Sequence, residues 1–138
     1  MPADPAPADL LPPNLDDFAA LAEHAWAALP AQFRAMAGDV VIRIEDFADA
    51  EVLSDLGIED PFELTGLYSG VDLTRQSYLD PARSIPMVFL YRRPILDEWA
   101  DRGNVVLGEL VAHVLVHEIG HHFGLSDEAM HAILDRAR

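Results

Sequence analysis

The sequence predicts an α+β fold, in which a small mixed β-sheet packs against one buried helix and additional helices cover the outside. Helix-like and strand-like patterns follow one another in the order helix, strand, helix, two strands and three helices, which favours a layered arrangement. The chain has 138 residues, and 51% of them are hydrophobic, which is enough for one core. We therefore expect a single domain over residues 14–138.

Residues 1–13 are rich in proline and alanine, which predicts a disordered, solvated tail. A helix is expected to begin after Asn14, because an acidic residue follows three positions later and apolar residues then recur at helical spacing as far as Pro30. This amphipathic segment would cover the core. Its His24 and Trp26 are expected to have structural roles.

The segment from Val40 to Phe47 alternates apolar and polar residues, which is the period of a strand with one covered face. Asp49 is then expected to cap a short helix that ends at Gly57. Leu64 to Leu73 is interrupted by two glycines, which predicts a short strand and turn near the sheet edge, or only a loop.

Met87 to Tyr91 is an uninterrupted apolar run after a proline, which predicts a central strand that is buried on both faces. A helix is expected to follow, with Pro94 in its first turn and with Ile95, Leu96 and Trp99 facing inward. A glycine and an asparagine then separate this helix from the next one.

The string H-E-x-x-H-x-x-G-x-x-D runs from His117 to Asp127. Residues four apart share one face of a helix, so His117 and His121 can direct imidazole nitrogens at one metal ion. Glu118 would lie beside that ion without binding it, which suits a general base acting on metal-bound water. Because Leu107 to Phe123 is apolar almost all round, this helix is expected to be buried, where polar side chains need partners.

Gly124 is expected to end this helix in the left-handed conformation that glycine adopts without steric cost. The chain would then turn back and bring Asp127 towards the histidines as a third ligand, with water at the fourth tetrahedral position. Alternatively, Ser126 or Asp127 only caps the last helix, which is expected over Glu128 to Ala137.

The remaining histidines are weaker candidates. His113 lies one turn before His117 on the same face, so it either supports the site or is a buried histidine bonded to a carbonyl. His122 points away from His121 and is not assigned to the metal. His131, on the last helix, is not assigned either.

Two tyrosines and two arginines outside the motif allow both a catalytic and a structural interpretation. Tyr68 and Tyr91 could donate to a developing oxyanion, although a packed tyrosine with a satisfied hydroxyl is the simpler interpretation. Arg92 and Arg93 could bind a substrate carboxylate, but pairing with the acidic surface is favoured.

The motif, together with Gly66-Leu67-Tyr68-Ser69-Gly70 and Leu90-Tyr91-Arg92-Arg93-Pro94, resembles the small bacterial zincin-like metallopeptidases, also called minimal zincins, over about residues 15–137. The resemblance implies a compact zincin core with one zinc ion, the ligands His117, His121 and Asp127, and Glu118 as the base. It also implies that the edge strand lines the cleft, where substrate backbone could add as another strand. The metzincins are similar too, but their third ligand is usually histidine.

The formal net charge of −15, with no lysine, repels phosphates and argues against nucleic acid or an anionic membrane as a partner. A cationic peptide segment would be attracted. The chain has no cysteine, so a zinc site must use histidine and carboxylate. No secretory signal or membrane span is recognisable, and we expect a cytoplasmic protein.

These features predict a zinc-dependent metallopeptidase with one Zn²⁺ per chain, which hydrolyses peptide bonds in a peptide or protein substrate. Glu118 would take a proton from the metal-activated water and pass it to the leaving amine. A catalytically silent zincin-like module, which binds zinc or a protein partner, is the alternative from another class. Hydrolysis of a non-peptide amide is a third alternative.

Overall fold

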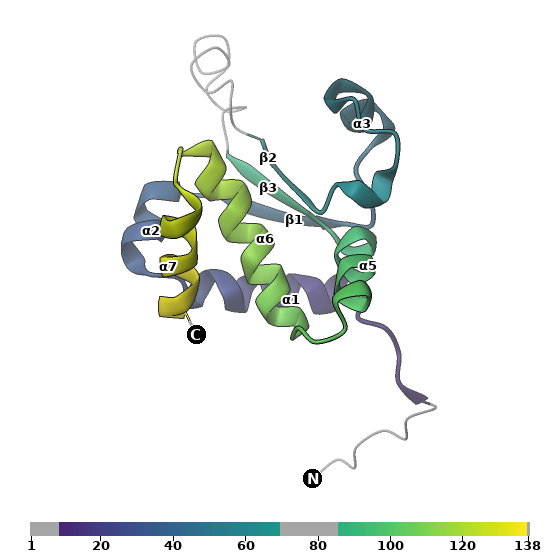
Figure 1. Cartoon of the computed structure of the whole chain (residues 1–138), viewed down its shortest axis with the longest axis horizontal. Helices are drawn as coiled ribbons and strands as arrows, with labels where there is room; N and C mark the ends of the chain where they lie inside the picture. The colour runs from purple at the N-terminus through teal and green to yellow at the C-terminus, as the bar shows by residue number, and fades with distance from the viewer. Residues whose placement is uncertain (1–8, 70–85, 138) are drawn as a thin grey trace.

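A three-stranded mixed sheet forms the centre of the structure, a computed structural model that describes residues 9–69 and 86–137 (Figure 1). The strands lie in the order β1 (Val41–Glu45), β3 (Met87–Tyr91) and β2 (Gly66–Ser69). β1 pairs with β3 in parallel, and β2 pairs with β3 in antiparallel orientation. The predicted α+β architecture and the central position of β3 are confirmed.

Helices of the described residues surround this sheet: α1 (Leu15–Ala28), α2 (Ala31–Ala37), α3 (Ala50–Leu56), the 3₁₀ helix η2 (Pro61–Glu63), α5 (Arg92–Arg102), α6 (Leu107–His122) and α7 (Asp127–Ala137). Asn14 and Asp17 form a capping box at the start of α1, as their spacing predicts. The sequence pattern does not predict α2. Pro30 ends the preceding helical pattern, but proline is also tolerated where a new helix starts.

Helix α3, before the central strand, and helix α5, after it, lie where the sequence predicts them. α3 ends at Gly57, which has a left-handed φ of 71°, whereas the side chain of Asp49 makes no capping hydrogen bond. In α5, Pro94 and Ile95 are buried. The indole of Trp99 donates a hydrogen bond to a carbonyl in the segment between α5 and α6.

The strand residues that face α1 and α6 line up across the sheet. The pairing register places Ile42, Val88 and Tyr68 in one row. Side chains alternate between the two faces of a sheet, and this row lies on the face that packs against α1 and α6. Val88 is fully buried, whereas Met87 and Phe89 are only half-buried. On the other face Tyr91 is 2% exposed, so the prediction that β3 is buried on both faces holds at Tyr91 and only in part at Met87 and Phe89.

Helix α6 crosses the strands and contacts α1, α5, α7, β2 and β3 (Figure 1). Its buried apolar residues are Leu107, Leu110, Val111, Val114, Leu115, Val116 and Ile119. The expected burial of this helix is confirmed, except at Phe123, which follows the last helical residue and is 39% exposed. Within the described ranges, no helix has the length and apolar character needed to cross a membrane.

Two predicted segments extend beyond the described residues. The expected edge strand is confirmed as β2, but the turn expected after it falls in residues 70–85, outside the described residues. The expected tail, residues 1–13, is described only from Asp9 onwards, where Leu11 is 87% exposed. The division of the chain into a tail and one domain therefore stays a prediction.

Arg92, at the start of α5, forms hydrogen bonds with two other parts of the chain. Its Nε donates to Asp46 Oδ1 at 2.6 Å, and its Nη1 donates to the Pro13 carbonyl at 2.9 Å. The guanidinium of Arg93 lies over the Phe47 ring, 5.7 Å from its centroid. The structure thus supports the favoured interpretation of Arg92 as a partner for the acidic surface.

Candidate metal centre

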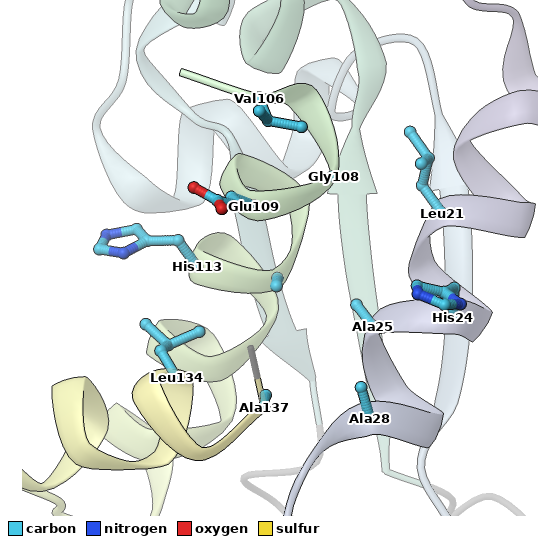
Figure 2. Close-up of a pocket in the computed structure, with 11 residues that line it drawn as sticks. Leu21, His24, Ala25, Ala28, Val106, Gly108, Glu109, His113, Leu134 and Ala137 are labelled. Atoms are coloured by element: carbon cyan, nitrogen blue, oxygen red, sulfur yellow. The ribbon is translucent and has the colours of Figure 1, made fainter. Parts of the chain in front are cut away.

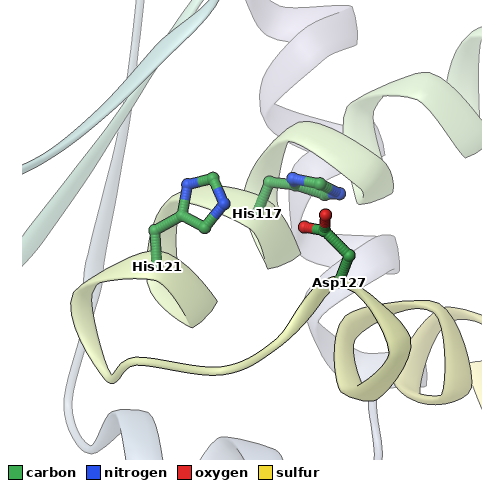
Figure 3. A group of neighbouring side chains, drawn as sticks. All are labelled: His117, His121 and Asp127. Carbon is green, nitrogen blue, oxygen red and sulfur yellow. The ribbon is translucent and has the colours of Figure 1, made fainter.

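Three side chains from the end of α6 and the start of α7 converge at one place (Figure 3). His117 and His121 come from α6, and Asp127 is the first residue of α7. One potential ligand atom from each residue lies within 4.8 Å of the other two. His117 is half-buried, whereas His121 and Asp127 are exposed. The structure therefore brings together all three residues that the sequence predicts as ligands.

The turn after α6 reverses the chain so that Asp127 meets the histidines. Gly124 has a φ of +73°, as predicted for a glycine that follows a helix. The amide of Leu125 donates to the Gly120 carbonyl at 2.9 Å, and the amide of Gly124 donates to the His121 carbonyl at 3.1 Å. These two bonds form a Schellman motif, which closes the helix and fixes the direction in which the chain leaves it.

Ser126, and not Asp127, supplies the capping side chain of α7. Its Oγ accepts a hydrogen bond from the amide of Ala129 at 3.1 Å. α7 therefore begins one residue earlier than predicted, at Asp127. Because Ser126 acts as the cap, the carboxylate of Asp127 is left available to a metal ion.

The Nε2 atom of His117 is buried and has no hydrogen-bond partner among the described residues. Leaving a buried polar atom without a hydrogen-bond partner lowers the free energy of unfolding by roughly 1–3 kcal/mol, unless another group such as a metal ion binds it. Burial lowers the pKa of His117, the charges of His121 and His131 add to the shift, and Asp127 opposes it. The imidazole thus favours its neutral form, which is the form that binds metal. Two imidazoles and one carboxylate are a donor set that suits zinc.

Glu118 lies beside this group and faces β2, where it is half-buried. Burial raises the pKa of its carboxyl, while the charge of His121 and a hydrogen bond with the Tyr68 backbone oppose that shift. Glu118 does not belong to the three-residue group. A carboxyl group whose pKa is raised in this way can act as a general base.

Gly66 in β2 permits the close approach that holds Glu118 in this place. A Cβ atom at residue 66 would lie 2.7 Å from Val114 Cγ1, 3.1 Å from Glu118 Cγ and 3.2 Å from the Phe89 carbonyl oxygen. Any side chain here would force Val114 to shift and would crowd Glu118. From the spacing of the glycines, the sequence predicts a turn or a sheet edge, but it does not predict this close packing at Gly66. The available signal is that an isolated glycine within a strand marks a close approach.

Two ring contacts lie next to the metal group. The ring of His113 packs on that of His117, with centroids 4.1 Å apart, a contact that neither predicted role of His113 includes. His122 stacks on Tyr68, also at 4.1 Å, and lies outside the three-residue group as predicted.

Burial raises the pKa of Tyr68, and burial together with neighbouring carboxylates raises the pKa of Tyr91 to about 12. Both tyrosines are buried, in agreement with a packing role.

A separate cavity of about 490 Å³ lies between α1, α6 and α7 (Figure 2). Small and apolar side chains line most of it, together with His24, Glu109 and His113. None of the three metal-group residues lines this cavity. His113 is among the residues that line this cavity, and its ring packs on that of His117, so it is next to both.

Comparison with known proteins identifies the family of this chain. The model of the family described as zincin-like metallopeptidase matches residues 37–136, a range that contains the three described strands, the metal group and Glu118. A search of curated proteins found no match. Because the family match spans well over half of the sequence and includes the complete H-E-x-x-H-x-x-G-x-x-D motif, the chain belongs to the zincin-like metallopeptidase family.

Proposed function

We propose that this protein is a zinc-dependent peptidase, which holds one zinc ion per chain through His117, His121 and Asp127 and uses Glu118 as its general base. The observation that carries the proposal is that His117, whose buried Nε2 has no hydrogen-bond partner among the described residues, offers a ligand atom within 4.8 Å of ligand atoms of His121 and Asp127. Three protein ligands are the number found in catalytic zinc sites, whereas structural sites have four.

Glu118 performs the proton transfers in this proposal. Zinc, when bound, would polarise the scissile carbonyl and lower the pKa of its water to about 7. Glu118 accepts a proton from the water that attacks the carbonyl and donates that proton to the leaving amine. Burial raises the pKa of Glu118, which makes the protonated carboxyl less costly to form. The hydrogen bond with the Tyr68 backbone keeps the carboxylate beside the metal group rather than in it.

The proposed substrate is a peptide or protein segment. β2 lies at the edge of the sheet and contacts α6 next to Glu118, so an extended backbone added along β2 would reach the site. The net charge of −15 would attract a cationic segment, and this attraction should weaken as salt is added.

The test joins a metal-content assay with digestion of a broad peptide library. We expect near-stoichiometric zinc in the purified protein, and cleavage that stops on treatment with a chelator and returns when zinc is added. Zinc binding without cleavage of any library member would favour a silent zinc-binding module. If the protein bound no zinc after exchange into metal-free buffer and readdition of the metal, the ligand set would be wrong.

A further inference from the structure

Met130 of α7 lies directly against Gly120 of α6. Met130 is fully buried, and a Cβ atom at residue 120 would lie 2.5 Å from its Sδ and 2.9 Å from its Cγ. Real Cβ atoms essentially never come within 3.0 Å of another atom, so a larger residue fits at position 120 only if Met130 moves. The two residues therefore contact each other where α7 packs on α6.

This contact lies within one helical turn of all three proposed ligands. Gly120 is three residues after His117 and immediately before His121, and Met130 is three residues after Asp127. Residues three apart in a helix lie on the same side, so Asp127 and Met130 share the side of α7 that faces α6. A change in helix spacing at Met130 would therefore move Asp127 relative to the two imidazoles.

Few other interactions hold the carboxylate of Asp127 in place. The hydrogen bonds and ion pairs found among the described residues include none to its oxygens, and its side chain is exposed. The turn fixes the direction in which the chain leaves α6, and Ser126 caps α7, but neither sets the distance between the two helices. A buried side-chain contact does set it, because protein interiors are close-packed and transmit displacements.

We propose that Met130, seated on Gly120, is a positioning residue that holds α7 at the distance from α6 at which Asp127 completes the metal site. This inference rests on the proposed zinc site. It adds to that site two residues that are neither ligand nor base. Met130 acts only through the placement of Asp127.

The first test changes the glycine. Gly120→Ala forces the 2.5 Å contact, and Gly108→Ala is its matched control in the same helix, because a Cβ at residue 108 meets nothing closer than 3.7 Å. Zinc affinity is measured by competition with a chelator. Gly120→Ala should weaken zinc binding by about tenfold or more, as happens when residues that orient a ligand are lost, whereas Gly108→Ala should stay within about twofold of wild type.

A second pair of variants covers the case in which Gly120→Ala does not fold. Met130→Ala and Leu134→Ala each delete a buried side chain from α7, so both should lower the melting temperature of the metal-free protein. Only Met130→Ala should also weaken zinc binding by about tenfold or more. In the double variant Gly120→Ala/Met130→Ala the short contact is absent, and zinc affinity should recover relative to Gly120→Ala alone.

Equal zinc affinities in Met130→Ala and Leu134→Ala would overturn the inference, since Met130 would then support the fold alone. A folded Gly120→Ala protein that binds zinc as tightly as Gly108→Ala would overturn it as well. Failure of the proposed function gives a different result, because the wild-type protein itself would then bind no zinc, and the positioning role would fall with the site.

Discussion

The two sides of α6 hold the two carboxylates of the site in different ways. On the β2 side, Gly66 lets helix and strand approach so closely that Glu118 is half-buried and hydrogen-bonded to the strand backbone. On the α7 side, Gly120 accommodates Met130, but Asp127 stays exposed at the start of a helix. Both sides depend on a glycine, yet only one of them buries its carboxylate.

This difference suggests that the two sides have separate tasks. A half-buried carboxylate whose pKa is raised, such as Glu118, suits proton transfer. An exposed carboxylate next to two imidazoles, such as Asp127, suits metal ligation. Changes on the α7 side should therefore alter zinc affinity, and changes on the β2 side should alter proton transfer and stability. The following predictions test this division, from the largest expected effect to the smallest.

Asp127→Ala, on the α7 side, should have the largest effect on zinc affinity. Removal of a ligand should weaken zinc binding by more than the ~10–100-fold that is typical when a residue supporting a ligand is lost. Glu128→Ala is the matched control, because Glu128 is the next residue of α7 and is also exposed and acidic. Chelator competition measures both affinities. If the two variants bound zinc equally well, Asp127 would not be a ligand.

Acid should also release the metal, which is proposed to bind between α6 and α7. Protons compete with zinc for its imidazole ligands as the pH falls, because only a neutral imidazole binds metal. Burial lowers the pKa of folded His117, so in the metal-free protein the unfolded chain binds the proton first. Stability is then present above pH 6.5 and is lost as the pH falls towards the lowered value. Zinc affinity that stayed constant down to about pH 4 would argue against two histidine ligands.

Gly66→Ala tests the β2 side. The added methyl group overpacks the contact with Val114 and Glu118, so the free energy of unfolding should fall by about 1–3 kcal/mol. Peptide hydrolysis should decrease because Glu118 is displaced, whereas zinc affinity should stay close to that of wild type. Urea unfolding and chelator competition measure the two quantities. Zinc affinity that fell as far as hydrolysis would show that the two sides of α6 are not separable.

The smallest of these effects should be a gain in stability of the metal-free protein in Glu118→Gln. Burial raises the folded-state pKa of Glu118 above 4.5, so its ionised form destabilises the fold at neutral pH. Glutamine removes this charge and should raise the melting temperature near pH 7. The gain should disappear below pH 4.5, where the carboxyl is protonated in both the folded and unfolded states. A gain that did not depend on pH would need another cause.

The positions of the proposed ligands could be predicted from the sequence because local geometry determines them. Four-residue spacing places His117 and His121 on one helix face, and Gly124 permits the left-handed turn that returns the chain to Asp127. The central and edge strands were predictable from apolar runs and glycines in the same way.

The remaining features depend on contacts between segments that are distant in the sequence or on differences in packing. The need for glycine at 120 follows from Met130 of another helix, which no local pattern reveals, and at 66 the local pattern does not show that Val114 and Glu118 are the side chains in contact. An apolar run such as β3 does not show that its residues are buried to different extents, with Val88 fully buried and Phe89 only half-buried. Similarly, the competition between Ser126 and Asp127 for the cap depends on hydrogen-bond geometry at a single turn.

The central claim is that Glu118 transfers protons and does not bind the metal, and Glu118→Gln tests it most directly. The substitution keeps the size of the side chain but removes the base. Zinc content and peptide hydrolysis should be measured side by side for wild type and variant. We predict unchanged zinc content and a fall in hydrolysis of at least the ~10²–10⁴-fold typical of a lost general base. Equal hydrolysis by the two proteins, with zinc fully bound in both, would contradict the account.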